Sequence, residues 1–429
     1  MTLTKADFRR SWLAIASLFF LLGFQYATWA SRLPAVKGRL GVSDAQVGLL
    51  LTVCGVGAAA SFPLVAVLLR RLGSRRAAEL SACVLALLPL ALAAAPDYPL
   101  ALAIACADGV AVACLDVAMN AQGSRLETLH QRTVMSRLHA VFSGGALAGA
   151  LLASAASALT GSLTAHFAFA AVVLLAILAA TRGGLLADDE PGPAQDPNPA
   201  RDTAEPSLTQ QSRDKPEPSE PSQPRRRRLI PLRAGRAALW MGCAMAFGTI
   251  TEGAMNDWSA LYLKNVARAA SSVTPMGIAV FSVAMVAARL FADGWRSRWG
   301  ELRVVGLGSA LAGVGLSIAV LVGGAACALA GFACVGLGVA AVTPCIYAAA
   351  ARQGTDALAL VAAMGTVGLL AGPGIIGLVS SASGLAWGMG AVAASAIIVS
   401  VCATRIPWPN ASASVDPDPQ GVATAAVIP

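Results

Sequence analysis

Apolar and polar positions follow one another along this chain in long blocks. Apolar runs of about twenty residues recur with short polar stretches between them, and this is the length that crosses a bilayer core of ~30 Å. Without water to satisfy the backbone, such runs must be helices. The pattern predicts an all-α membrane protein of about twelve transmembrane helices, at 11–31, 46–69, 77–95, 100–121, 134–158, 163–181, 237–263, 275–293, 304–322, 325–349, 357–380 and 385–404.

Composition agrees with a membrane protein. Of the 429 residues, 56% are hydrophobic and 13% are charged, whereas a soluble domain carries roughly 25% charged residues. The nine cysteines all fall in apolar segments without a C-x-x-C pair, so we expect small apolar packing residues rather than disulfides or metal ligands. Walker loops, metal clusters and nucleophile triads are absent from the sequence, so we expect no cofactor, no metal and no enzymatic activity.

The basic residues indicate the orientation. Of the 31 Lys and Arg residues, 26 fall on the side of the predicted N-terminus and 5 on the other side. The net charge of +8 therefore reflects membrane topology rather than nucleic-acid binding. The run from Trp12 to Ala30 resembles a signal peptide, but it is long and no cleavage site follows. We predict a multi-pass protein of the bacterial inner membrane with both termini in the cytoplasm.

A polar segment divides the chain. Residues 188–224 are rich in Pro, Asp, Glu, Ser and Gln, a composition that predicts disorder, and the run 225–228 is four arginines. The arginines suit a cytoplasmic anchor to anionic lipid, and a regulatory or partner-binding site is the alternative. The predicted organisation is an N-terminal six-helix bundle (1–181), a disordered cytoplasmic linker (182–236), a C-terminal six-helix bundle (237–404) and a cytoplasmic tail (405–429).

The two bundles carry signs of duplication. Trp29 matches Trp258 at an offset of 229, and Gly73 matches Gly300 at an offset of 227. A third match, of GGALAG in the fifth helix with GPGIIG in the eleventh, has an offset of 228. Nearly constant offsets indicate a repeated six-helix unit, which is an architecture of secondary transporters.

Ionisable residues are expensive inside a membrane, at ~2.5–3.5 kcal/mol for an Asp or Arg at a helix centre. Here they gather on the predicted helices 4, 5 and 7, and helix 1 adds the polar Gln25 and Thr28, whereas helices 9 and 12 have no charged residue in their interiors. The third helix of each triplet is therefore predicted to face lipid, and the others to line a cavity. Pairing within the bundle is the structural alternative, above all for Asp108. The predicted substrate and proton-coupling residues are Gln25, Trp29, Asp116, Asn120, His139, Glu252, Asn256 and Asp257.

Two predicted loops carry basic residues around a glycine, at 70–76 (RRLGSRR) and 289–300 (RLFADGWRSRWG). They resemble the gating loop of major facilitators, roughly G-x-x-x-D-R-x-G-R-R. An Asp at a helix end can bond an Arg of the neighbouring helix and release it when the halves rock. The second loop has an acid at the expected place, whereas the first has Arg70 there; positive-inside charge alone is the alternative. The predicted gating residues are Arg71, Gly73 and Arg75 in the first loop, and Asp293, Arg296 and Gly300 in the second.

Three segments point to a narrower family. They are 116–120 (DVAMN), 132–144 (RTVMSRLHAVFSG) and 252–259 (EGAMNDWS). They resemble the MosC-like group of major facilitators, which is distantly similar to fucose permeases and includes proteins linked to the use of rhizopine, an inositol derivative. The resemblance implies proton-coupled movement of a small polar, sugar- or polyol-like solute.

Three functions fit these observations. The first is a proton-coupled transporter of a small polar solute, acting by alternating access as a monomer in the lipid bilayer. The second is an efflux antiporter for amphipathic compounds, although the Gly-Pro pair typical of helix 5 in such antiporters is replaced by Gly144-Gly145. The third is a membrane sensor or scaffold that binds without transport.

Overall fold

The computed structural model describes residues 5–130, 134–187 and 235–408. Residues 188–234 of the predicted linker, with its four arginines, and residues 409–429 of the predicted tail lie outside these residues. The described chain is helical, with one short 3-10 segment at Arg182–Gly184 and no strand. Its helices are α1 (Lys5–Ala30), α2 (Leu33–Leu40), α3 (Asp44–Ala60), α4 (Phe62–Ala94), α5 (Tyr98–His130), α6 (Met135–Leu159), α7 (Leu163–Thr181), α8 (Arg236–Asn265), α9 (Met276–Trp299), α10 (Glu301–Val322), α11 (Ala325–Val339), α12 (Val342–Arg352), α13 (Thr355–Ser383) and α14 (Leu385–Ala403).

The helices account for about twelve membrane spans. By length and composition alone, the described residues contain nine helices able to cross a membrane, or ten if the bent pair α2 and α3 counts as one span. Helix α4 consists of two helical parts, because Gly73 leaves helical geometry (φ 76°, ψ 168°) and divides it. Its first part continues α3 as the second predicted span, and its second part is the third. Helices α8 and α9 are less apolar because they carry ionisable residues. With these two helices, the ten spans become twelve.

Two predicted helices are broken where the sequence analysis expected continuous ones. The second breaks at Ser61, before Pro63 in the first turn of α4, and the tenth breaks between α11 and α12, before Pro344. Proline has no N–H to donate and fits the first turn of a helix, so a chain that bends starts a new helix there. The short α2, which begins at Leu33 and has Pro34 in its first turn, lies in a stretch between two predicted spans.

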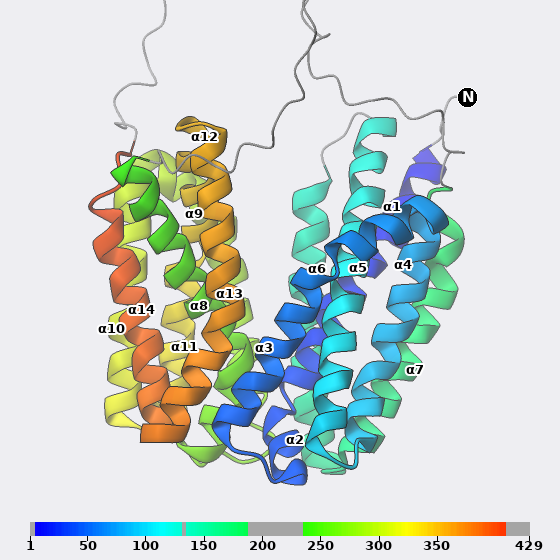
Figure 1. Ribbon diagram of the computed structural model, residues 1–429, viewed down its shortest axis with the longest axis horizontal. Helices are drawn as coiled ribbons and strands as arrows, with labels where there is room; N and C mark the ends of the chain where they lie inside the picture. Colours follow the sequence, from blue (N-terminus) through cyan, green and yellow to red (C-terminus); the bar gives the residue numbers. More distant parts are fainter. Residues whose placement is uncertain (1–4, 131–133, 188–234, 409–429) are drawn as a thin grey trace, which may run out of the picture.

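The helices form two bundles that stand side by side, α1–α7 and α8–α14 (Figure 1). The same pairs of helices pack in both. Helix α1 packs on α6 as α8 packs on α13, α3 on α5 as α9 on α11, and α4 on α7 as α10 on α14. This correspondence confirms the duplicated architecture that the sequence offsets indicated.

The helices predicted to face lipid carry exposed apolar side chains. Examples are Val172 of α7 (65% exposed), Leu321 of α10 (84%) and Trp387 of α14 (69%). Large apolar side chains without a protein neighbour are stable where hydrocarbon surrounds them. This placement agrees with the third helix of each triplet lying on the outside.

The bundles are joined at one end. Helix α1 begins and α14 ends at the upper end of Figure 1, and the turns between α1 and α3, α6 and α7, and α8 and α9 lie at the lower end. One buried apolar cluster unites the second bundle with first-bundle residues near the lower end, such as Trp29, Leu50 and Phe167. The upper part of the first bundle has its own separate cluster, around Phe19 and Leu115. The apolar core is therefore continuous between the bundles only near the lower end.

Candidate functional site

The lower half of α1 presents two adjacent polar side chains to two different acids. Gln25 is buried and its Nε2 donates to Oδ1 of Asp108 in α5 at 2.8 Å. The other carboxyl oxygen, Oδ2, accepts from Sγ of Cys54 in α3 at 3.8 Å. Asp108 is 7% exposed, so its partners are the polar groups that compensate for its burial.

The next residue, Tyr26, joins the two bundles. Its Oη donates to Oδ1 of Asp257 in α8 at 2.7 Å. Consecutive residues of a helix point ~100° apart, since a turn holds 3.6 residues. Gln25 can therefore contact its own bundle while Tyr26 reaches the other. Asp257, at 7% exposed, is as buried as Asp108.

Glycines allow α3 and α5 to come close beside Asp108. A Cβ built on Gly109 would overlap the backbone carbonyl of Cys54, and one built on Gly57 would overlap the backbone of Cys106. Backbone atoms cannot turn aside as a flexible side chain can. The two glycines thus set the helix spacing that places the Cys54 thiol beside the Asp108 carboxyl.

A second group of predicted residues lies higher in the first bundle. Asn120 Nδ2 donates to Oδ1 of Asp116 at 3.1 Å and to the Asp116 carbonyl at 2.8 Å. His139 lies on α6 of the same bundle, and its ring meets Phe19 of α1 edge-on at 5.1 Å. Asp116 and His139 are exposed, unlike Asp108. The structure thus pairs Asp116 with Asn120, one turn apart on α5, and places His139 on another helix of the same bundle.

The remaining predicted residues lie on α8 and the end of α1. Glu252 forms an ion pair with Arg289 of α9, with Oε1 and the guanidinium nitrogen 3.4 Å apart. Asn256 donates to the Glu252 carbonyl at 3.1 Å. Trp29 is buried and its ring meets that of Tyr26 edge-on at 6.4 Å. The eight predicted residues therefore form a buried group that spans both bundles, and two more exposed groups around Asp116 and Glu252.

The loops predicted to gate share a backbone geometry. Gly73 (φ 76°, ψ 168°) and Gly300 (φ 82°, ψ 156°) adopt nearly the same positive-φ conformation, which favours glycine. This explains their match in the sequence. Arg71 is exposed, and Arg75 pairs with Glu79 at 3.1 Å. Asp293 belongs to α9, but its side chain lies outside the described part of the structure.

The second loop contains a charge cluster that the sequence analysis did not name. Arg296 and Arg352 each donate to one carboxyl oxygen of Glu301, both at 2.7 Å. Glu301 thereby ties the turn between α9 and α10 to the end of α12. Two charge-assisted bonds to one carboxylate form a stronger tie than a single exposed pair.

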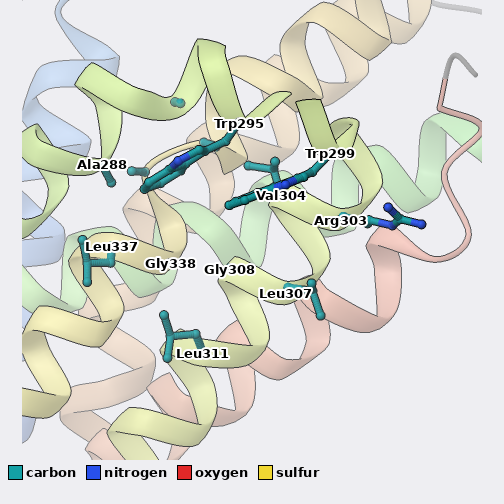
Figure 2. Close-up of a pocket in the computed structure, with 13 residues that line it drawn as sticks. Ala288, Trp295, Trp299, Arg303, Val304, Leu307, Gly308, Leu311, Leu337 and Gly338 are labelled. Carbon is teal, nitrogen blue, oxygen red and sulfur yellow. The ribbon is translucent and has the colours of Figure 1, made fainter. Parts of the chain in front are cut away.

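A pocket of about 490 Å³ lies between α9, α10 and α11, and none of the predicted site or gating residues lines it. Figure 2 shows Trp295 and Trp299 on one side of it and Leu311 and Leu337 on the other. Leu307 at its edge is 69% exposed, on a helix that faces lipid. This pocket suits acyl chains rather than a polar solute.

Comparison with known proteins identifies the family. The Major Facilitator Superfamily model matches residues 13–356, which is most of the chain. The chain belongs to the major facilitator superfamily. This major facilitator is 32% identical over 396 residues to an uncharacterized MFS-type transporter of Yersinia pestis, with 90% of this chain and 94% of that protein covered. It is 29% identical over 400 residues to the membrane protein MosC of Rhizobium meliloti, with 91% and 88% covered. The resemblance to MosC seen in the sequence is thus confirmed.

Solved structures confirm the fold. The nucleoside transporter NupG superposes with a TM-score of 0.67 at 14% identity, covering 92% of this chain and 98% of its own. A bacterial homolog of the human lysosomal transporter Spinster, in an inward-facing and occupied conformation, superposes with a TM-score of 0.65 at 14% identity, covering 94% and 97%. The major facilitator fold, with secondary transport as the activity of the family, follows from these comparisons.

Sequence reasoning missed several residues of the site. Tyr26, Cys54 and Arg289 were not proposed as members, and Asp108 was set aside as structural. A tyrosine or cysteine is inconspicuous in an apolar helix, because both occur often as packing residues. The only available signal for Tyr26 was its position next to Gln25 in a helix already expected to line the site.

Proposed function

We propose that this major facilitator couples the movement of a small polar solute to protons, by alternating access, with the upper end of Figure 1 in the cytoplasm. The observation that carries the proposal is the hydrogen bond from Tyr26 to Asp257 between the two bundles. Rocking of the bundles to open the lower end would separate these groups and admit water to Asp257. A carboxyl group binds its proton more firmly when buried than when hydrated, so such motion can take up and release a proton.

The exposures of the acids support a division of roles. Asp116 is exposed in this state and Asp257 is buried. When the upper end closes and the lower end opens, the two acids would exchange environments. We assign Asp116, with Asn120 and His139, to proton binding from the upper side, and Asp257 to the response on the lower side.

We assign binding of the solute to Glu252 and its neighbours. The Glu252 carboxylate, the Asn256 amide and the Arg289 guanidinium offer hydrogen-bond acceptors and donors on α8 and α9. Polar groups of this kind recognise hydroxyl-bearing solutes in preference to apolar compounds. A polyol- or sugar-like solute is therefore our proposed class, and we propose the monomer as the working unit.

Vesicle transport tests the assignment of Asp116. A first screen in proteoliposomes would measure uptake of polyols, sugars and organic acids with and without an imposed pH gradient. With the solute found, Asp116→Asn should abolish accumulation driven by the pH gradient, because an amide cannot carry the proton. Counterflow, in which solute exchanges downhill, should persist in the same vesicles.

The matched variant is Glu252→Gln, which removes an acid of the other bundle. It should weaken solute binding, seen as a raised half-saturation concentration in counterflow, and should leave pH-driven accumulation detectable at high solute. Accumulation at wild-type levels by Asp116→Asn would remove Asp116 from the coupling path. Solute movement in no arm of the screen would oppose the transport proposal itself.

A further inference from the structure

A polar pocket lies at the lower end, where the two bundles meet. Its volume is about 170 Å³. The first bundle contributes Ser31 and Arg32 after α1 and Ser157 of α6, and the second contributes Lys264 of α8 with Ser271 and Thr274 before α9. The pocket is distinct from the acidic groups of the proposed transport site, since no Asp or Glu is among its described lining residues.

The pocket concentrates positive charge without a balancing carboxylate. Arg32 is 5% exposed. One terminal nitrogen of its guanidinium donates to Ser157 Oγ, and the other donates to the Gly161 carbonyl at 2.9 Å. Lys264 Nζ donates to Ser271 Oγ at 3.1 Å. Neither cation has an ion-pair partner among the described residues. For Arg32, which is buried, an unpaired charge is costly.

Two buried polar atoms without a hydrogen-bond partner belong to residues that line the same pocket. Ser31 is 1% exposed and its hydroxyl has no partner within the described structure, and Nε of Arg32 is likewise buried without a partner. A volume of 170 Å³ exceeds the ~10–15 Å³ that one water needs in the same measure. The pocket thus has room for a polyatomic ion with water, and its guanidinium, ammonium and hydroxyl donors suit an oxyanion.

We propose that this pocket binds a small tetrahedral oxyanion, a phosphate or sulfate group, and that the bound anion stabilises the state in which the lower ends of the bundles are packed together. The reason is geometric, because Arg32 and Lys264 belong to different bundles. Opening of the lower end would separate the two cations and dismantle the pocket. A ligand that binds one of two states shifts the population toward that state.

Thermal unfolding of the purified full-length protein tests the site. Inorganic phosphate would be titrated at constant ionic strength with chloride as the balancing anion. Saturable binding should raise the Tm by a few degrees, and Lys264→Gln and Arg32→Gln should each abolish most of that rise. Lys264 is exposed, so its variant removes the charge without disturbing the buried core.

Arg268→Gln is the matched control. Arg268 is an exposed cation of the same α8–α9 connection and does not line the pocket, so its variant should retain the wild-type response to phosphate. Hydrogen exchange of residues 264–276 should slow with phosphate in the wild type and not in Lys264→Gln. A Tm that does not change with phosphate, or a response that is lost equally in Arg268→Gln, would overturn a site for free phosphate.

A second arm distinguishes a free ion from a lipid headgroup. In phosphate-free buffer, nanodiscs of phosphatidylglycerol would be compared with nanodiscs of phosphatidylcholine. A Lys264-dependent gain in Tm with phosphatidylglycerol, without any response to free phosphate, would assign the site to a lipid phosphate. Absence of a Lys264-dependent gain in both arms would refute the proposal, whatever the outcome of the transport assays.

Discussion

Tyr26 and Gln25 are neighbours in α1, yet their side chains are bound to acids in different bundles. The bond from Gln25 to Asp108 lies within one bundle, so it survives any rigid-body motion of the bundles. The bond from Tyr26 to Asp257 crosses between them, so separation of the lower ends would break it. A hydrogen bond that is present in only one state acts directly on the balance between states.

Tyr26→Phe should shift that balance toward opening of the lower end. Leaving a buried acceptor without its partner costs ~1–3 kcal/mol, and 1.4 kcal/mol is a factor of ten in an equilibrium. We expect Cys54, which lies beside Asp108, to react several-fold faster with a membrane-impermeant maleimide applied at the lower side, as read site by site with mass spectrometry.

Tyr98→Phe is the control for this experiment. It also removes a phenol hydroxyl, which donates to the Gln46 carbonyl at 2.7 Å within the first bundle. The alkylation rate of Cys54 should stay at the wild-type value. Equal rates in the two variants would show that the Tyr26 bond does not distinguish the states.

At the scale of helices, close packing through glycine sets where polar groups meet. Gly109 and Gly57 bring α3 and α5 together beside Asp108, whereas Gly144 of α6 has open space where a Cβ would lie. Sequence spacing alone did not show which glycine lies at a helix contact. Gly144 belongs to the repeated GGALAG segment, whereas Gly109 belongs to no motif. Only the contact surface of each helix shows which glycine is needed.

Gly109→Ala should destabilise the protein, since its Cβ would collide with the Cys54 backbone and force the two helices apart. Overpacking of this kind costs ~1–3 kcal/mol. Gly144→Ala should be neutral or stabilising, because alanine favours a helix over glycine by ~1 kcal/mol. Thermal unfolding in detergent would compare the two variants, and an unchanged Tm for Gly109→Ala would contradict the close approach.

At the scale of the whole molecule, the bundles share one apolar core near the lower end and have separate cores above it. This arrangement is closed at the lower end. With the orientation that the basic residues predict, the closed end faces the periplasm. The state described is then inward-facing.

Reporter fusions test that orientation. Fusions at Gly161 and Gly323 should be active with a periplasmic reporter, because both lie in turns at the lower end. Fusions at Ser74 and Gly354 should be active with a cytoplasmic reporter. The expectation rests on the distribution of the 31 basic residues, of which 26 lie on one side. One inverted, well-expressed fusion within either bundle would contradict the orientation.

The number and apolar character of the spans and the duplication of the two bundles could be predicted from the sequence, and exposed apolar side chains agree with the helices predicted to face lipid. These properties depend on local composition, because an apolar run of about twenty residues in hydrocarbon has no stable alternative to a helix. The match of Gly73 with Gly300 was visible in the sequence, and the structure adds that both adopt a positive φ.

The tertiary structure decided which polar groups meet. Tyr26 and Asp257 are 231 positions apart, and nothing local to either residue encodes their contact. The rotation of each helix about its axis, and the depth at which it packs, determine whether an acid is buried like Asp108 or exposed like Asp116. Those two quantities arise from the packing of all the helices together, so the pocket between Arg32 and Lys264 also became visible only in the folded chain.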